Sequence, residues 1–239
     1  MLRGLYTAAS GIQAQTAKND IYVANLANIS SAGYRRSQVS QESFPQSLAA
    51  LDNGAPIQLR GGVTVSSGGL DLTPGPITQT ANDFDLTIVG SGFFCVRTPA
   101  GVAFTRNGQF QLDADSVLVN RDGYPVLGVK GIIRIASGKL KVDEQGQAWD
   151  GDKPVDALRI VDFSDGANLS KQAGSLLVGT GSRPADDYTI VQGAFEGSNV
   201  NALLELQRMM NGFRLYEANV RALQMQDDSI ETLLSQALG

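Results

Sequence analysis

Three pairs of aspartates are the side chains in this sequence whose spacing could support acid–base chemistry. On a strand, two carboxylates spaced by two residues would face the same side, as the acid and the base of a hydrolase do. Each pair stands beside Gly, Asn or Ser, however, where Asp commonly closes a turn. We therefore interpret the pairs as turn residues. The alternative is a carbohydrate-cleaving enzyme, which would need Asp113 and Asp150 to face one cleft. The pairs are Asp83 with Asp85, Asp113 with Asp115, and Asp150 with Asp152.

The absence of histidine removes most other catalytic chemistry. The chain has no histidine and a single cysteine, whereas serine and cysteine hydrolases usually need a His base and zinc or non-haem iron sites usually need His ligands. Cys95 lies in an apolar run, which is typical of a small buried hydrophobe rather than a nucleophile. Residues Gly90-Ser91-Gly92 begin like a dinucleotide fingerprint but lack the third glycine and the following helix, so they predict a bend in a strand. We expect no catalytic, cofactor or metal site.

Charge and hydropathy argue against nucleic acid and membranes as partners. The chain carries 19 basic and 24 acidic side chains, a net charge of −5, and its arginines are scattered. We expect no nucleic-acid partner, because no basic stripe is evident that would hold phosphates. No run approaches the roughly 18 apolar residues of a membrane span. The first residues lead into a polar helix without the apolar core and cleavage site of a secretory signal, so we expect any export to leave the chain uncleaved.

Apolar residues recur at steps of three and four at both ends of the chain, which predicts two terminal helices. The first helix is expected from about Leu2 to Asn28, and the last is a longer, unbroken heptad. Matching stripes favour helices that pack on each other or on copies of themselves, with an ordinary intramolecular hairpin as the alternative. We expect Asp227, the only charge on the C-terminal seam, to pair with Arg3, Arg221 or a cation on a neighbour. The predicted interface seams comprise Leu5, Ile12, Val23, Leu26, Leu206, Met209, Phe213, Tyr216, Val220, Leu223, Asp227, Ile230 and Leu234.

Between the helices the helical period gives way to short β-like runs. Asp122-Gly123 and Asp150-Gly151, each flanked by apolar residues, fit the tight turns of hairpins because glycine accepts a positive φ. Consecutive hairpins predict an antiparallel β domain whose apolar faces need another layer. The fold class is therefore α+β, in which a discontinuous coiled coil of N- and C-terminal helices brackets an antiparallel, hairpin-rich β domain. The expected parts are an N-terminal helix (1–34), an extended linker with short strands (35–79), the β domain (80–195) and a C-terminal helix that packs with the N-terminal one (196–239).

Three blocks of motifs follow one another along the chain. The opening block is Ser10-Gly11-Ile12, Ala24-Asn25-Leu26-Ala27-Asn28 and Gly33-Tyr34-Arg35-Arg36. The middle block is Asp85-Leu86, Ile88, Gly90, Gly92-Phe93-Phe94, Thr105-Arg106, Gly108, Phe110 and Gly123-Tyr124-Pro125-Val126-Leu127. The closing block is Ser198-Asn199-Val200-Asn201, Met209-Met210, Arg214, Tyr216-Glu217-Ala218-Asn219 and Gln226-Asp227. Together the blocks are similar to those of the axial proteins of the bacterial flagellum, specifically the rod proteins of the basal body, over nearly the whole chain except about residues 37–75.

The resemblance implies a structural subunit of the rod rather than an enzyme. The terminal helices would stand nearly along the rod axis around a central export channel, and the β domain would form an outer layer. Implied partners are copies of the chain, neighbouring rod proteins in a helical tube and ring proteins around the rod, with no small-molecule substrate. The implied location is the periplasm-spanning rod, reached without a cleaved signal peptide. The family-motif residues are Asn25, Asn28, Gly33, Tyr34, Asn199, Asn201, Glu217 and Asn219.

The subtype is predicted from smaller features of the chain. There is no room for the extra outer domain of a hook subunit, which favours the rod. The short length and the approach to the last helix, Ala194 to Asn199, favour the proximal rod protein over the distal one, which stays the alternative. Phe213 and Leu215 stand where the family often has Gln and Ala. A non-flagellar, β-rich surface binding module oligomerised by its helices is a further alternative, but its stalk would need one continuous coil.

Overall fold

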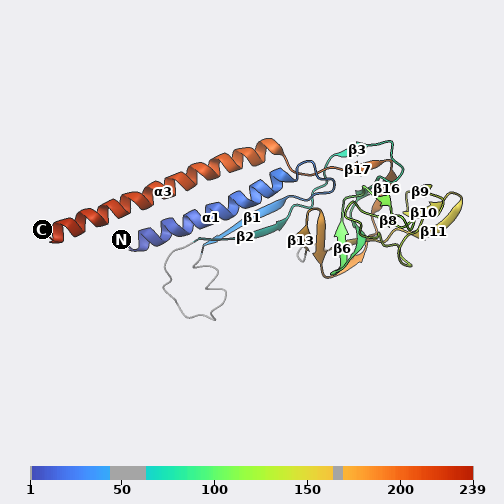
Figure 1. Ribbon diagram of the computed structural model, residues 1–239, viewed down its shortest axis with the longest axis horizontal. Coiled ribbons are helices and arrows are strands. Elements are labelled where there is room, and N and C mark those ends of the chain that lie inside the picture. Colours follow the sequence, from blue (N-terminus) through green and yellow to red (C-terminus); the bar gives the residue numbers. More distant parts are fainter. Residues whose placement is uncertain (1, 44–62, 164–168, 239) are drawn as a thin grey trace. The chain divides into compact units, whose positions relative to one another are not determined.

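The computed structural model describes residues 2–43, 63–163 and 169–238 (Figure 1). The chain divides into two compact units. The helical unit and the β unit are each built from segments that lie far apart in the sequence. The helical unit comprises residues 1–27, 37–68 and 201–239, and the β unit comprises residues 28–36 and 69–200.

The β unit takes in more of the chain than the β zone expected at residues 80–195. It also includes the segment 28–36, which follows the first helix, and the segment 69–79. Buried ion pairs and hydrogen bonds between distant residues hold these segments, and apolar periodicity does not reveal such contacts. The division into four parts at the expected bounds stays a prediction.

Two long helices dominate the helical unit, as the apolar periodicity predicts. Helix α1 spans Leu2–Ala27 and helix α3 spans Ala202–Leu238. At 1.5 Å per residue they are about 39 Å and about 55 Å long. Strands β1 (Ser37–Ser43) and β2 (Val63–Leu70) form a two-stranded sheet. The predicted α+β class, with terminal helices in contact that bracket antiparallel sheets, is confirmed.

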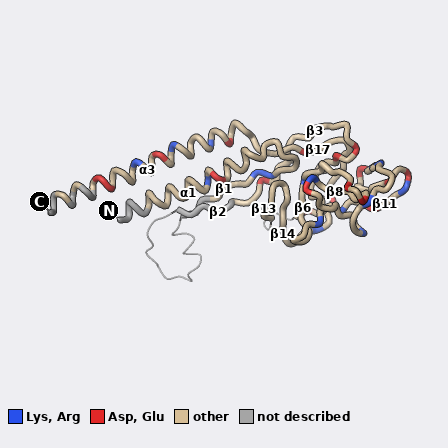
Figure 2. The backbone as a smooth tube through the Cα atoms, in the orientation of Figure 1, with Lys and Arg blue, Asp and Glu red and all other residues tan. Residues whose placement is uncertain are grey.

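Asn201 caps the start of helix α3. The side-chain Oδ1 of Asn201 accepts a hydrogen bond from the backbone N–H of Leu204 at 3.2 Å, and its carbonyl accepts one from Glu205 at 3.0 Å. An asparagine in this position satisfies one of the N–H groups that a helix start leaves unpaired. Figure 2 shows that basic and acidic residues are interspersed along both helices, without a long run of one sign.

The β unit consists of short strands whose registered pairings are antiparallel. Its largest sheet has the order β13-β14-β6-β5-β12-β15, beside a sheet β11-β10-β9 and the pairs β16-β4, β17-β3 and β7-β8. The bounds are β3 Ile77–Gln79, β4 Leu86–Gly90, β5 Phe93–Thr98, β6 Gly101–Thr105, β7 Gln111–Leu112, β8 Leu118–Val119, β9 Leu140–Val142, β10 Gln147–Asp150, β11 Lys153–Ala157, β12 Ile160–Phe163, β13 Leu169–Ala173, β14 Leu176–Gly179, β15 Ser182–Pro184, β16 Tyr188–Gln192 and β17 Ala194–Glu196.

Strand β5 separates two apolar cores. Phe94 and Val96 belong to a larger core, whereas Phe93 and Cys95 belong to a second core, because successive side chains on a strand face opposite sides. Cys95 is 0 % exposed, and burial raises the pKa of its thiol to about 11. The prediction that Cys95 is a small buried hydrophobe is therefore confirmed.

Within the described residues of the β unit one five-residue turn occurs three times, twice with an aspartate as its first residue. In residues 113–117, 120–124 and 143–147 the side chain of the first residue, Asp or Asn, accepts hydrogen bonds from the N–H groups of the third and fifth residues. The fourth residue has a positive φ in each case, which favours glycine. These fourth residues are Ser116 (58°), Gly123 (81°) and Gly146 (84°).

The predicted hairpin at Asp150-Gly151 is present, whereas the predicted bend at Gly90 is a connection between strands. Asp150 pairs with Lys153 across the turn that joins β10 to β11, and Gly151 has a φ of 60°. Gly90 ends β4 and Gly92 precedes β5, with φ values of 105° and 110°. The two strands belong to different sheets. The prediction of a bend within one strand was therefore wrong, because the chain passes from one sheet to another at Ser91, between two glycines whose positive φ angles are foreign to a regular strand.

Candidate assembly surfaces and a buried ion cluster

Glycines and amide side chains make close contacts between α1 and α3. A Cβ atom placed on Gly212 would lie 2.2 Å from Oδ1 of Asn19 and 2.5 Å from Nε2 of Gln15. These two buried amides hydrogen-bond to each other at 3.2 Å. A Cβ atom on Gly11 would lie 3.1 Å from Nδ2 of Asn219. The two helix backbones therefore approach each other closely, and larger side chains would push them apart.

The α3 residues at this contact recur every seven positions, and Glu205 is the most buried of them. Its side chain is 1 % exposed, accepts a hydrogen bond from Nδ2 of Asn25 at 3.4 Å and forms an ion pair with Arg208 at 2.6 Å. Since Asn25 lies opposite Glu205 and Gly11 lies opposite Asn219, the helices run antiparallel. The intrachain face of α3 is thus small and polar, unlike the apolar seam of a common coiled coil.

Large apolar side chains of α3 lie away from this contact and are exposed. Leu203 is 77 % exposed, Met210 54 % and Phe213 50 %. With Leu206 they follow one another at steps of three and four residues, so they share one side of the helix. We call these four residues the outer stripe. A contiguous exposed apolar surface of this kind marks an interaction site.

The predicted seam residues show different degrees of burial. Leu206, Phe213, Tyr216 and Val23 are exposed, whereas Ile12, Leu26, Met209, Val220 and Leu223 are half-buried. Leu5, Ile230 and Leu234 lie on the helices, but their side chains fall outside the described residues. Their role as subunit interfaces stays a prediction.

Asp227 is exposed on α3. Nη2 of Arg221, one of its predicted partners, lies 4.0 Å from Oε2 of Glu217, at a surface where such pairs contribute little. The side chain of Arg3, the other candidate, lies outside the described residues. The pairing of Asp227 with a cation therefore stays a prediction.

Two family-motif asparagines hold neighbouring residues of the chain, one in each unit. In the helical unit, Asn25 accepts a hydrogen bond from Ser37 N–H and donates one to the Ser37 carbonyl, both at 3.0 Å. In the β unit, Asn199 accepts from Arg36 N–H at 2.7 Å and donates to the carbonyls of Asp71 at 2.8 Å and Thr73 at 3.0 Å. Both side chains thus supply hydrogen-bond partners to backbone groups of other segments of the chain.

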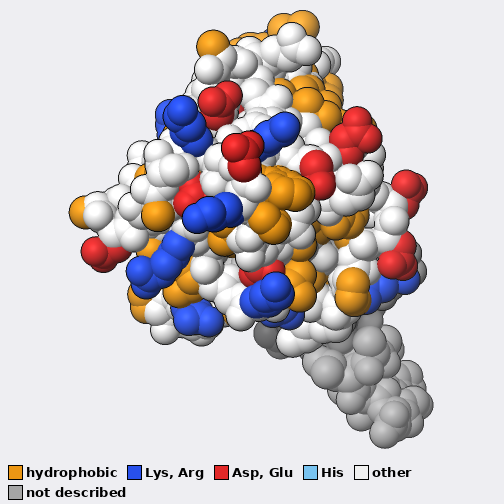
Figure 3. All heavy atoms as spheres, turned by 90° about the vertical axis from the view of Figure 1, so that its right-hand side faces the viewer, with side chains coloured by type: hydrophobic (Ala, Val, Ile, Leu, Met, Phe, Trp, Pro, Cys, Tyr) orange, Lys and Arg blue, Asp and Glu red, His pale blue; other side chains and the backbone are white. Residues whose placement is uncertain are grey.

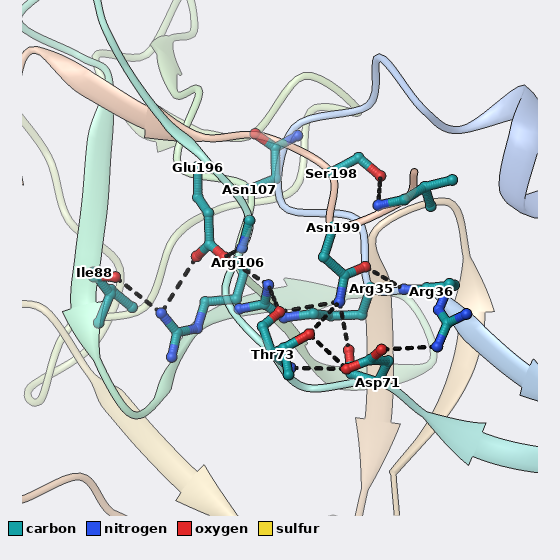
Figure 4. A network of polar contacts seen from close by, with 12 residues as sticks. Arg35, Arg36, Asp71, Thr73, Ile88, Arg106, Asn107, Glu196, Ser198 and Asn199 are labelled. Atoms are coloured by element: carbon teal, nitrogen blue, oxygen red, sulfur yellow. Dashed lines mark hydrogen bonds and ion pairs between the residues drawn. The ribbon is translucent and has the colours of Figure 1, made fainter. Parts of the chain in front are cut away.

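A buried ion cluster in the β unit is centred on Glu196 (Figure 4). Its Oε1 accepts from Nη1 of Arg35 at 2.5 Å and from Gly75 N–H at 2.7 Å, and its Oε2 lies 3.4 Å from Nη1 of Arg106. The three charged side chains are at most 6 % exposed. Buried charges of this kind are tolerated only when they are paired and hydrogen-bonded.

Arg106 is stabilised by more than its carboxylate partner. Nη1 and Nη2 donate to the carbonyls of Ile88 at 2.9 Å and Gly90 at 2.7 Å, and the guanidinium lies 5.3 Å from the Phe93 ring centroid. Burial lowers the pKa of Arg106 to about 10, an effect that Glu196 opposes and Arg35 reinforces. Arg106 stays protonated at neutral pH, so the cluster holds two cations against one carboxylate.

Gly33 and Tyr34, two predicted motif residues, lie beside this cluster. Gly33 donates its N–H to the Glu196 carbonyl at 2.7 Å. Its φ is 65°, and a Cβ atom there would lie 2.1 Å from the Asn107 backbone nitrogen. Only glycine fits this close approach. Tyr34 is buried beneath Nζ of Lys171, which lies 3.5 Å from the ring centroid.

The remaining motif residues lie outside the cluster. Asn28 is half-buried, and it accepts a backbone hydrogen bond from Ser31 at 3.2 Å. Asn201 caps α3 and Glu217 is exposed. Sequence reasoning assigned no role to Glu196, Arg35, Arg106, Glu205 or Gly212. Arg35 and Arg106 lie within the motif blocks of the sequence. A charged residue within an otherwise apolar block could have indicated a buried ion pair.

The aspartate pairs serve local structure. Asp113 closes the recurring turn, whereas Asp150 accepts hydrogen bonds from the backbone N–H groups of Ala136 and Ser137. Asp85 accepts hydrogen bonds from Thr80 and Asn82 at 2.8 Å and 3.0 Å. Within the described residues no cluster of three or more potential metal ligands occurs.

The charge distribution on one face of the β unit and the apolar character of the described helices bear on two other kinds of partner, polyanions and membranes. Figure 3 shows one face of the β unit, where basic and acidic side chains alternate around small apolar areas. That face therefore has no field of a single sign that would select a polyanion. None of the described helices combines the length and apolar character of a membrane span.

The exposed apolar stripe on a helix about 55 Å long is typical of a protein that associates with other subunits. Asp113 closes a turn, Asp150 accepts backbone hydrogen bonds, and Cys95 is buried. These features are typical of a subunit of a larger assembly, which functions by contacts between protein surfaces.

Comparison with known proteins specifies the family. A model of the flagellar hook protein FlgE/F/G D1 domain matches residues 87–149, and a model of the flagellar basal body rod FlgEFG protein C-terminal region matches residues 191–236. A flagellar basal-body rod protein FlgG of Bacillus subtilis is 30 % identical over 267 residues, which cover 98 % of this chain and 99 % of the relative. A flagellar basal-body rod protein FlgF of Mesorhizobium japonicum is 30 % identical over 249 residues, which cover 99 % and 100 %.

The chain therefore belongs to the FlgF/FlgG family of flagellar basal-body rod proteins, which are structural and not enzymatic. The predicted resemblance is confirmed. Relatives of similar identity carry either name, and FlgF of Escherichia coli is 26 % identical over 96 % of both chains. The comparison thus identifies the rod family but does not distinguish FlgF from FlgG.

Proposed function

We propose that this chain is a structural subunit of the flagellar rod that assembles helically, through its terminal helices, into the drive shaft. The observation that carries the proposal is the outer stripe of α3, which lies on the side of the helix away from the α1 contact. Head-to-tail contacts join two different surfaces of identical subunits, and where they do not close into a ring they generate a helical tube. Copies of the chain and neighbouring rod proteins are the proposed partners.

Burial of the outer stripe would supply a large part of the assembly energy. Fully burying one large apolar side chain contributes about 1.5–3 kcal/mol, and Phe213 and Met210 are each about half exposed in the lone subunit. Each would therefore gain about 1 kcal/mol on full burial. Burial of the outer stripe by a neighbouring subunit would thus add apolar stabilisation to that of the α1 contact.

The experiment is to place a charge in the outer stripe with Phe213→Asp. Since the β unit does not depend on this side chain, protein levels should stay normal while rod assembly and motility are lost. Gln207→Asp adds the same charge at an exposed polar position of α3 and is the matched control. Normal motility with Phe213→Asp, or equal loss with both variants, would refute the proposal.

Within the rod we propose the proximal position and export without a cleaved signal peptide. The support is the short chain and the approach from Ala194 to Asn199, together with the polar first helix. The distal position is the alternative. Labelling of the chain in purified basal bodies would locate it, and mass spectrometry of the assembled subunit would show whether Met1 or Leu2 still begins it.

A further inference from the structure

Residues 69–76 form a strap on the β unit that is held largely by polar contacts. Only Leu70 and Leu72, both half-buried, are packed against the second core. Asp71 forms an ion pair with Arg36, in which Oδ2 of Asp71 lies 3.0 Å from Nη2 of Arg36. The backbone N–H of Asp71 also donates a hydrogen bond to the Arg36 carbonyl at 2.9 Å. A segment with few apolar contacts opens at a lower free energy than the core that it covers.

Glu196 fixes this strap and the segment 28–36 at the same time. Its Oε1 accepts from Gly75 in the strap and from Arg35 in the segment 28–36. Nη1 of Arg35 also donates to the Thr73 carbonyl at 2.9 Å, which ties the two segments to each other. In Figure 4 the side chains of Arg35 and Arg106 converge on the Glu196 carboxylate from different segments of the chain.

The larger core is independent of these contacts. It is built from residues such as Leu86, Val96, Leu118 and Ile133, and neither the strap nor the segment 28–36 contributes a buried residue to it. Loss of the Glu196 carboxylate would remove the ion-pair partner that the two buried guanidinium groups share, which is strongly unfavourable. The cost would be relieved by opening the strap, which lets water reach Arg35.

We propose that Glu196 is a lock that closes the strap and the segment 28–36 onto the β unit in one cooperative step, while the larger core stays folded when the lock opens. Glu196 lies at the end of β17, the last strand of the chain. The lock therefore closes only when this last strand is in place, so the segment 28–36, which follows α1, and the strap, which leads from β2 to β3, become fixed only in a completed subunit. This inference does not depend on the position of the chain in the rod.

Hydrogen exchange on the unmodified full-length chain gives the first test. The amides of Gly33, Asp71 and Gly75, which bond to Glu196 or Arg36, should exchange through one common opening, at least ten-fold faster than the Leu118 amide of the larger core after correction for intrinsic rates. Exchange of all four amides at one common protection factor would overturn the proposal, because the strap would then open only with global unfolding.

Thiol labelling of Cys95 gives the second test, because this single cysteine lies in the core that Leu70 and Leu72 cover. Glu196→Gln should raise the labelling rate of Cys95 at least ten-fold while the fluorescence of Trp149, on β10, keeps its native emission. Glu144→Gln, the same change at an exposed position, is the matched control and should label like the unmodified chain. An unchanged rate in Glu196→Gln, or faster labelling only together with unfolded Trp149 emission, would overturn the lock.

Discussion

Substitution of Gly212 by alanine tests the polar contact between α1 and α3 through the sign of its effect. On an isolated helix the change is favourable, because alanine exceeds glycine in helix propensity by about 1 kcal/mol. In this subunit the added methyl would lie 2.2 Å from Oδ1 of Asn19 and 2.5 Å from Nε2 of Gln15. Both amides are buried, so they cannot move aside without losing their mutual hydrogen bond at 3.2 Å.

The expected net effect is destabilisation of the helix pair by about 1–2 kcal/mol. Leaving a buried amide unsatisfied costs about 1–3 kcal/mol, which exceeds the gain of about 1 kcal/mol from propensity. The measurement is the hydrogen-exchange protection of α1 amides around Gln15 and Asn19 in the full chain. Asn211→Ala, at the exposed neighbouring position, is the control and should slightly raise protection. If Gly212→Ala also raised protection, the close approach of the two helices would be refuted.

Three further predictions concern single side chains. Ser116→Gly should stabilise the β unit by up to about 1 kcal/mol in urea unfolding, because Ser116 holds a φ of 58°; lower stability would show that the serine is not strained. Burial lowers the pKa of Lys171 to about 8 from 10.5. Between these pH values Lys171 binds more protons in the unfolded chain than in the folded one, so its contribution to stability should rise with pH from about 8 to about 10.5, whereas the raised pKa of Cys95 contributes with the opposite sign. Lys171→Met should abolish this rise, and a profile shared by both proteins would contradict it. If Asp227 sets the register between subunits, Asp227→Leu should impair rod assembly despite the added apolar area, and full assembly of both Asp227→Leu and Asp227→Asn would show that the charge specifies nothing.

The elements of the fold were predictable because their signals are local. Steps of three and four apolar residues indicated α1 and α3. Asp150-Gly151 indicated a hairpin because the turn needs glycine at a positive φ. Asp113 was correctly interpreted as a turn residue from its polar neighbours. All of these depend on residues within a few positions of one another.

The contacts that organise the subunit were not predictable, because they join residues far apart in the sequence. Nothing near Glu196 indicates that Arg35 is its partner. Hydrophobic periodicity also gave no information about which side of α3 faces α1. The face of α3 that contacts α1 contains Gly212 and Asn219. Apolar periodicity does not reveal such residues, because glycine and amide side chains let two helix backbones approach closely without burying large apolar side chains. Of the apolar residues that define the period, Leu206 and Phe213 lie on the outer stripe, whereas Met209, Val220 and Leu223 are half-buried.

A map of the assembled rod that resolves side chains would test the central claim most directly. The account predicts that Met210 and Phe213 are buried against another subunit, while Gly212 keeps its contact with Asn19 of the same chain. A rod in which Phe213 faces solvent or the channel, and in which α1 and α3 of one chain have separated, would contradict it.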